Sequence, residues 1–156
     1  VLTDMKYIND SKLMTQIVAD TNIVQCTIYY RFYLNQALKK AGLGNRYVEL
    51  LSPWRNMLAI GLTTFAEKPE PSRSDCHAWS ASPNYDLLAT VLGVTPGSAG
   101  FKTVVIAPSP GNLSFVKGTV PHPNGIIEMS IKKTGNTGME ATVLLPQNTT
   151  GVFLWQ

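Results

Sequence analysis

The spacing of hydrophobic residues changes character near residue 93. Before that point, apolar residues recur about every 3.6 positions, which is typical of amphipathic helices. This pattern predicts the end of an earlier helix over residues 10–19 and helices over 23–44, 45–61 and 77–92. Gly42 or Gly44 is expected to end the second helix. In the third, Asn45 is expected to act as the cap, and Pro53 predicts a kink or a break.

After Gly93 the pattern changes to short runs rich in β-branched residues, which are separated by turn-forming residues. These runs predict strands at residues 101–108, 113–120, 125–133, 139–146 and 151–156. The Asn124-Gly125 pair, within Pro-His-Pro-Asn-Gly, predicts a β-hairpin between two of them. Short strands with this spacing favour an antiparallel sandwich, which residues 93–100 would join to the helices.

The helical part is more apolar than a small bundle can bury. The segment Thr-Ile-Tyr-Tyr-Arg-Phe-Tyr-Leu at 27–34 is strongly aromatic, and a helix that is apolar on nearly all sides needs neighbours on all sides. We therefore expect these helices to belong to a larger helical array. The abrupt start at Val1, without an initiator Met or a signal peptide, is also typical of a fragment of a longer protein.

Composition and charge exclude several classes of protein. The chain has 156 residues, of which 44% are hydrophobic and 15% charged, so it can fill a core and is too apolar for disorder. Its net charge of +3 comes from scattered Lys and Arg residues, which do not indicate a nucleic-acid surface. No apolar run is long enough to span a membrane. Cys26 and Cys76 are expected to be small packing residues rather than a disulfide framework.

The candidate chemistry lies between residues 61 and 83. Glu67 directly follows an apolar run, so its carboxylate is expected at the edge of the packed region, where partial desolvation makes a carboxylate a better proton acceptor. Glu70, between two prolines, is expected to face water. A solvated surface role remains the alternative for Glu67, and Asp75 or Ser74 is equally a candidate N-cap.

His77 stands at the expected start of the last helix, where the helix dipole favours a neutral, hydrogen-bonding imidazole. The adjacent Cys76 is not expected to form a catalytic pair with it, because neighbouring helix residues do not face each other. The second histidine, His122, lies in the other part of the chain, so no metal site is predicted. There is also no glycine-rich phosphate loop between a strand and a helix, and we expect no cofactor.

Several motifs resemble those of one known family. They are Leu-Thr-Thr-Phe-Ala-Glu at 62–67, His-Ala-Trp-Ser-Ala-Ser-Pro at 77–83, and the hairpin sequence Gly-Thr-Val-Pro-His-Pro-Asn-Gly at 118–125. Together with Tyr-Tyr-Arg-Phe-Tyr-Leu at 29–34, they resemble the C-terminal end of bacterial α-L-rhamnosidases of glycoside hydrolase family 78. The resemblance covers essentially the whole chain.

The resemblance implies an α+β chain in two units. Residues 1–93 would be the last helices of an incomplete (α/α)6 barrel, which is the catalytic domain of the family, and residues 94–156 would be a C-terminal antiparallel β-sandwich. The remainder of the barrel, upstream of Val1, would then be the partner that covers the apolar helices.

The resemblance also implies an activity. The family removes terminal α-L-rhamnose with inversion, using one carboxyl group to protonate the leaving oxygen and another to activate water. Glu67 matches the general base, and Glu70 remains an alternative, because Ala66 stands where the family often has Trp and the loop to His77 is short. The general acid lies upstream and has no counterpart here, so the chain alone is expected to be inactive.

The remaining candidates concern the sugar. By resemblance, His77 matches a histidine that contacts rhamnose, and Trp79, Trp54 and Asp75 are further candidates for a wall that binds its CH faces and hydroxyls. Trp54 and Trp79 are equally candidates for the core. The expected ligand is a rhamnose-containing glycoside or polysaccharide, with no nucleic-acid or membrane partner.

Two other functions remain open: a non-catalytic carbohydrate-binding module, and a purely structural helix–sandwich unit. A sandwich that binds sugar should carry aromatic residues in its loops. Those of the C-terminal part fall instead within strand-like runs and are expected in the core: Phe101, Phe115, Phe153 and Trp155. The polar and aromatic residues gathered at 54–85 therefore favour the enzyme.

Overall fold

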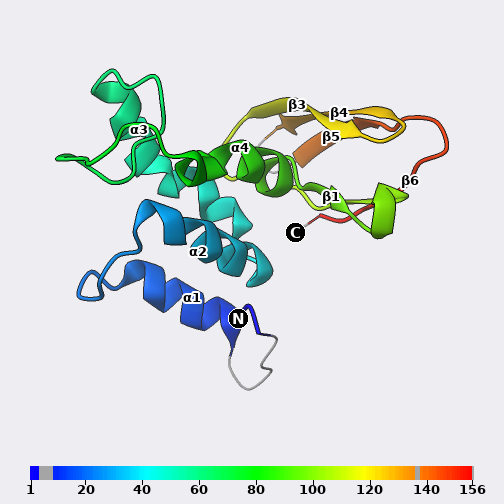
Figure 1. Ribbon diagram of the computed structural model, residues 1–156. Coiled ribbons are helices and arrows are strands. Elements are labelled where there is room, and N and C mark those ends of the chain that lie inside the picture. The colour runs from blue at the N-terminus through cyan, green and yellow to red at the C-terminus, as the bar shows by residue number, and fades with distance from the viewer. Residues whose placement is uncertain (4–8, 136–137, 156) are drawn as a thin grey trace. The chain divides into compact units, whose positions relative to one another are not determined.

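A computed structural model describes residues 1–3, 9–135 and 138–155 (Figure 1). The chain forms two compact units, Val1–Asn84 and Tyr85–Gln156. The first is helical, and the second combines the end of a helical segment with β-sheets, in agreement with the expected α+β class. The division falls earlier than the expected one after Gly93, because Leu88 and Leu92 pack into the core of the strands.

Among its described residues, the helical unit contains three α-helices and two 3-10 helices, followed by the start of a fourth α-helix. They are α1 (Asp10–Ala19), α2 (Ile28–Lys40), η1 (Gly44–Leu51), α3 (Ser52–Ala59), η2 (Ala78–Ala81) and α4 (Ser82–Asp86). The helix expected over 10–19 is confirmed. The next one begins at Ile28 rather than at residue 23, and Gly42, with a positive φ of 75°, follows its end as expected.

Pro53 divides the helix expected over 45–61. The residues before it form the 3-10 helix η1, and α3 begins at Ser52 with the proline in its first turn. A proline is tolerated there because its missing N–H would have had no partner within the helix. Asn45 is not a cap, because the residue that precedes η1 is Leu43. Two small hydrophobic clusters hold the unit together, one around Leu38 and one around Trp54.

The C-terminal unit begins with a short π-helix, η3 (Leu87–Val91), and continues as two three-stranded sheets. The strands are β1 (Val94–Pro96), β2 (Thr103–Ile106), β3 (Phe115–His122), β4 (Gly125–Thr134), β5 (Gly138–Leu144) and β6 (Thr150–Phe153). The sheet orders are β1-β2-β6 and β3-β4-β5. Val104 and Ile106 of the first sheet share one hydrophobic core with Ile127 and Ile131 of the second.

The hairpin at Asn124-Gly125 is confirmed, since β3 and β4 pair antiparallel with His122 opposite Gly125. The expectation of antiparallel strands throughout is wrong for β2 and β6, which pair in parallel. β6 follows β5 of the other sheet, so no tight hairpin forces it to run antiparallel to β2. The segment expected only as a joint contains β1. Residue 156, in the last expected strand, lies outside the described residues.

The aromatic residues of this unit are less buried than expected. Phe101 packs against the core, but Phe115, Phe153 and Trp155 are 56%, 36% and 51% exposed. Burial alternates along β3, and Phe115 falls on its outward positions, whereas every residue of β6 is exposed. Membership of a strand therefore did not determine burial here.

Candidate functional site

Two chain segments run side by side where the sequence placed the candidate chemistry. The backbone N–H of Glu67 donates a hydrogen bond to the carbonyl of Ser74 at 2.9 Å, and the N–H of His77 donates to the carbonyl of Phe65 at 2.7 Å. The hydroxyl of Thr64 also donates to the backbone carbonyl of Asp75. These bonds close the loop of residues 68–73 and hold Glu67 and His77 on paired backbone.

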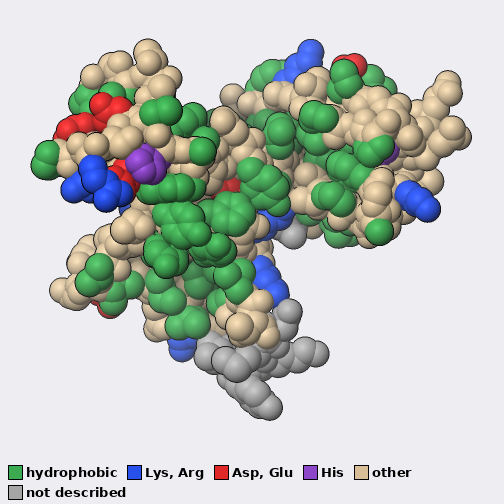
Figure 2. Space-filling model, in the orientation of Figure 1, with side chains coloured by type: hydrophobic (Ala, Val, Ile, Leu, Met, Phe, Trp, Pro, Cys, Tyr) green, Lys and Arg blue, Asp and Glu red, His purple; other side chains and the backbone are tan. Residues whose placement is uncertain are grey.

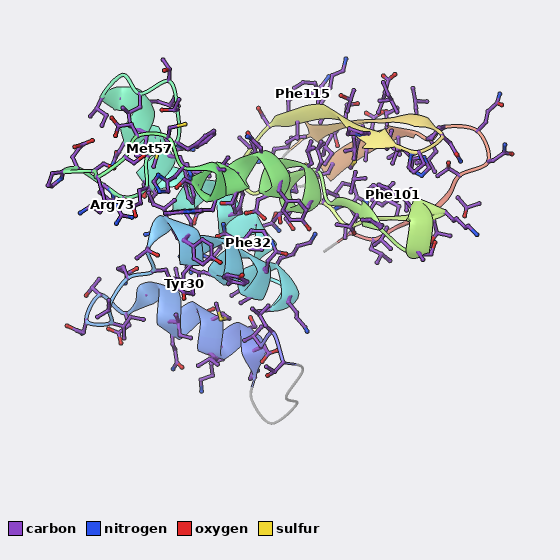
Figure 3. All side chains as sticks on the ribbon, viewed as in Figure 1. Tyr30, Phe32, Met57, Arg73, Phe101 and Phe115 are labelled. Atoms are coloured by element: carbon purple, nitrogen blue, oxygen red, sulfur yellow. The ribbon has the colours of Figure 1, made fainter. Side chains whose placement is uncertain are left out.

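Glu67 is anchored at the edge of a hydrophobic cluster and paired with a cation. Its neighbour Ala66 is buried in the cluster with Met57 and Trp54, and the side chain of Glu67 is only 16% exposed. Arg73 donates from Nε to Oε2 of Glu67 at 2.9 Å and from Nη2 to Oε1. This two-pronged contact fixes the plane of the carboxylate. The burial fits the sequence-based expectation, whereas the loop-borne Arg73 (Figure 3) was not anticipated.

Glu70 has a different environment. It is exposed, and its Oε2 accepts a hydrogen bond from the backbone N–H of Ser72 at 3.0 Å. Together with Lys68 and Pro69 it lies at the border of an apolar concavity of about 310 Å³ beside α3, which Glu67 does not line. Glu70, unlike Glu67, therefore lies at this concavity.

His77 and Trp79 lie against each other, with ring centroids 4.8 Å apart and planes inclined at 68°. The Nδ1 atom of His77 is buried and has no hydrogen-bond partner among the described residues. Buried polar atoms are nearly always paired, so this nitrogen is a candidate to bind an external hydroxyl group. Figure 2 shows histidine, acidic and basic side chains next to one another on the surface of the helical unit.

The other two candidates have different positions. Trp54 is buried, and its Nε1–H donates to the carbonyl of Ser80 at 2.7 Å, so it supports the η2 turn from within the core and does not form an exposed wall. Asp75 is exposed. The expected cap is not formed, because η2 starts after His77 and has no side-chain cap bond. Cys76 is exposed and not a packing residue, as is Cys26.

An aromatic group on α2 adjoins Trp79 and was not singled out from the sequence as a site. The ring of Tyr29 lies 5.4 Å from that of Trp79 and 6.1 Å from that of Tyr33. A hydrogen bond with Tyr33, repulsion between the two phenolates and desolvation raise the pKa of Tyr29. The phenol of Tyr29 thus remains a neutral hydrogen-bonding group as the pH rises through the ordinary range of tyrosine.

The described part of the chain contains neither a metal-binding cluster nor a membrane-spanning helix. Within residues 1–3, 9–135 and 138–155, no cluster of three or more His, Cys, Asp or Glu side chains could hold a metal ion. In the same ranges, no helix has the length and hydrophobicity to cross a lipid bilayer.

Comparison with known proteins identifies relatives of both units. Residues 93–154 match the family described as bacterial alpha-L-rhamnosidase C-terminal domain. Over 65 residues the chain is 35% identical to an alpha-L-rhamnosidase of Alteromonas sp. (strain LOR), a match that covers 41% of this chain and 7% of that protein.

Solved structures extend the similarity to the helical unit. The GH78 family rhamnosidase of Bacillus sp. GL1 matches 83% of this chain with 30% identity and a TM-score of 0.69, over 16% of its own length. The alpha-L-rhamnosidase of Dictyoglumus thermophilum matches 91% with 21% identity and a TM-score of 0.78, over 17% of its length. That of Streptomyces avermitilis, complexed with L-rhamnose, matches 78% with 23% identity and a TM-score of 0.67, over 13% of its length. The last two show likeness of fold.

The fold and these relatives first indicate a class: the chain is similar to regions of glycoside hydrolases. Within that class it is similar to the C-terminal part of the α-L-rhamnosidases, one of which is a GH78 family enzyme. It spans only 7% of the curated relative and 16% of the Bacillus enzyme.

Proposed function

We propose that this chain is part of an enzyme that removes terminal α-L-rhamnose from glycosides with inversion, and that Glu67 is its general base. The observation that carries the proposal is the position of Glu67. Its carboxylate is mostly buried, is oriented by Arg73, and stands on backbone that is hydrogen-bonded to the segment of His77. A fixed carboxylate whose backbone pairs with the segment that carries an imidazole with an unpartnered ring nitrogen suits the binding of a sugar and the activation of water.

In the proposed reaction, Glu67 accepts a proton from a water molecule whose oxygen attacks the anomeric carbon. The bond to the leaving oxygen breaks, and a carboxylic acid from another part of the protein protonates that oxygen. Inverting enzymes hold the two carboxyl groups roughly 6.5–9.5 Å apart, which leaves room for the water. Arg73 acts as a positioning residue, because its two hydrogen bonds orient the carboxylate.

The residues after the loop would bind the sugar. His77 would hydrogen-bond a rhamnose hydroxyl through its unpartnered Nδ1, and Trp79, which is 37% exposed, would pack against a CH face. The exposed carboxylate of Asp75 would accept hydrogen bonds from hydroxyl groups. Trp54 would contribute indirectly, because its bond to the carbonyl of Ser80 supports the turn that carries Trp79.

The same proposal assigns residues 1–93 to the end of an (α/α)6 barrel and residues 94–156 to a C-terminal β-sandwich domain. Exposed apolar side chains on and after α3 support the incomplete barrel: Leu58 is 74% exposed and Ile60 58%. Apolar concavities of about 310 and 430 Å³ adjoin the same helix. The remainder of the barrel would be the partner of this surface.

The decisive test is Glu67→Gln in the complete protein, with an aryl α-L-rhamnoside as substrate. Turnover should fall at least about a hundredfold, the usual scale of a general base. Substrate binding should be nearly unchanged, because the amide keeps the shape and loses only the proton acceptor. Azide should partly restore turnover and give an inverted glycosyl azide, since a small anion can attack the sugar directly.

Glu70→Gln is the matched control and should leave turnover near the wild-type value. If Glu70→Gln is inactive while Glu67→Gln is not, the base is Glu70. If neither substitution affects turnover, or if the complete protein does not cleave rhamnosides, the alternative function as a non-catalytic carbohydrate-binding or structural module is favoured.

A further inference from the structure

A concavity of about 300 Å³ lies between α2 and the η2 turn, within the helical unit. Its rings come from Tyr29, Phe32, Tyr33 and Trp79, and Ser82 is also among the residues that line it. We call it the aromatic pocket. Figure 2 shows hydrophobic side chains gathered over α2, and Figure 3 marks Phe32 and the neighbouring Tyr30 on that helix.

The rings of the aromatic pocket orient one another. Tyr29 and Trp79 meet edge to face, with centroids 5.4 Å apart and planes inclined at 82°. Phe32 and Tyr33 meet in the same way at 5.4 Å and 77°. Edge-to-face contacts are favourable because the positive edge of one ring meets the negative face of the other. The pocket is therefore lined by mutually supported rings from two separate segments of the chain.

Two polar atoms at the pocket have no partner among the described residues. Ser82 Oγ is buried and belongs to a residue that lines the pocket. His77 Nδ1 is equally buried, and its ring lies against Trp79, one of the pocket's walls. Burying such groups unpaired costs free energy, so a ligand hydroxyl that reaches them would remove that cost.

The composition of the lining indicates the class of ligand. Aromatic walls with a few polar atoms are typical of sites for small organic molecules. None of the residues that line the pocket is charged, which favours a neutral ring over an acidic or phosphorylated one. The flat CH face of a pyranose and the face of an aryl group both fit aromatic walls.

We propose that the aromatic pocket binds the second ring of the substrate, the neutral ring to which the terminal rhamnose is attached. This inference rests on the proposed function, because it places the rhamnose at His77 and the next ring beyond Trp79. The shared chemistry is an apolar ring face, which either an aryl aglycone or a neighbouring sugar can supply. Ser82 Oγ would add a hydrogen bond that only a hydroxyl-bearing ring can use.

The test compares three substrates of the complete protein: methyl α-L-rhamnoside, an aryl α-L-rhamnoside and a rhamnosyl-glucose disaccharide. For each of the two substrates with a second ring, the measured quantity is the ratio of its kcat/KM to that of the methyl glycoside. In Tyr33→Ala this ratio should fall about five- to tenfold, the scale of one lost ring contact. Tyr30→Ala is the matched control, because Tyr30 is on the same helix, is 58% exposed and does not line the pocket. Its ratio should stay at the wild-type value.

Ser82→Ala separates the two ligand sources. A pyranose in the pocket predicts a lower ratio for the disaccharide alone, and an aryl ring predicts no change. A ratio unaltered in Tyr33→Ala, or altered equally in Tyr30→Ala, overturns the proposal. A lower melting temperature of Tyr33→Ala without a change in its kcat/KM ratio also overturns the proposal. In that case the rings of the aromatic pocket pack against another part of the protein and not against the substrate.

A readout without hydrolysis keeps this inference distinct from the proposed function. Phenyl β-glucoside, which carries rings but no rhamnose, should quench the tryptophan fluorescence of the complete protein, and more weakly in Tyr33→Ala than in Tyr30→Ala. If rhamnosides are not cleaved but this binding is observed, the proposed function fails and the ring site stands. If rhamnosides are cleaved and the probe does not bind, the ring site fails alone.

Discussion

His77 follows Glu67 by ten positions in the chain, yet two backbone hydrogen bonds place their segments side by side. In the complete protein, His77→Ala should raise KM for an aryl rhamnoside and also lower kcat. The reason is that the lost hydrogen bond to the sugar acts in both the bound and the transition state. Steady-state kinetics beside Glu67→Gln, which should lower kcat alone, provide the measurement. An unchanged KM would place His77 outside the sugar site.

The contact between the phenols of Tyr29 and Tyr33 on α2 predicts a change in titration when Tyr33 is replaced. Replacing Tyr33 by Phe removes the hydrogen bond that raises the pKa of Tyr29, so that pKa should return toward the ordinary tyrosine value of about 10. In the native protein, the raised pKa means that the Tyr29 phenol binds its proton more tightly in the folded state than in the unfolded chain. The resulting stability is fully present below pH about 10 and is lost as pH rises through the raised value. An NMR titration of the Tyr29 ring signals at alkaline pH in both proteins measures the shift, and an unchanged midpoint for Tyr29 would contradict it.

At the scale of elements, Gly93 joins the helical segment η3 to β1. Its backbone lies in close contact with Ala107, the residue that follows β2. Gly93 has a φ of +76°, and an added Cβ would lie 2.2 Å from the carbonyl of Ala107, whose N–H donates to Gly93 at 2.9 Å. Gly93→Ala should therefore destabilise the C-terminal unit by about 3 kcal/mol, through both backbone strain and the clash. Urea unfolding of the protein measures the loss.

Gly100→Ala is the control for that substitution. Gly100 also has a positive φ, +68°, but an added Cβ would meet nothing within 4 Å. It should lose only the backbone term of about 1–2 kcal/mol. Equal losses at the two positions would show that the close approach to Ala107 contributes nothing.

At the scale of the whole molecule, the proposal places the general base in this 156-residue chain and the general acid in another part of the protein. It therefore predicts that this chain alone does not cleave rhamnosides. It carries the proposed base but lacks the acid that must protonate the leaving oxygen. An assay of the isolated chain against an aryl rhamnoside, beside the complete protein, provides the comparison. Turnover by the isolated chain, abolished by Glu67→Gln, would require an acid among its own residues.

The sequence by itself determined the change from helices to strands, the break at Pro53 and the hairpin at Asn124-Gly125. These features follow from local chemistry: the period of apolar residues, the missing N–H of proline, and the turn preference of Asn-Gly. The motifs around Glu67 and His77 resemble those of the α-L-rhamnosidases by their residues alone. Local signals of this kind do not depend on distant contacts.

Only the tertiary structure decided which side chains meet. The parallel pairing of β2 with β6, the exposure of Phe115 and the burial of Trp54 depend on segments far apart in the chain. The contact of Arg73 with Glu67 crosses a loop whose course has no periodic signal. The aromatic pocket requires α2 to lie against η2, which is separated from it by more than thirty-five residues. Such contacts are set by packing over the whole unit, because the free energy of burying each surface depends on every neighbour available to cover it.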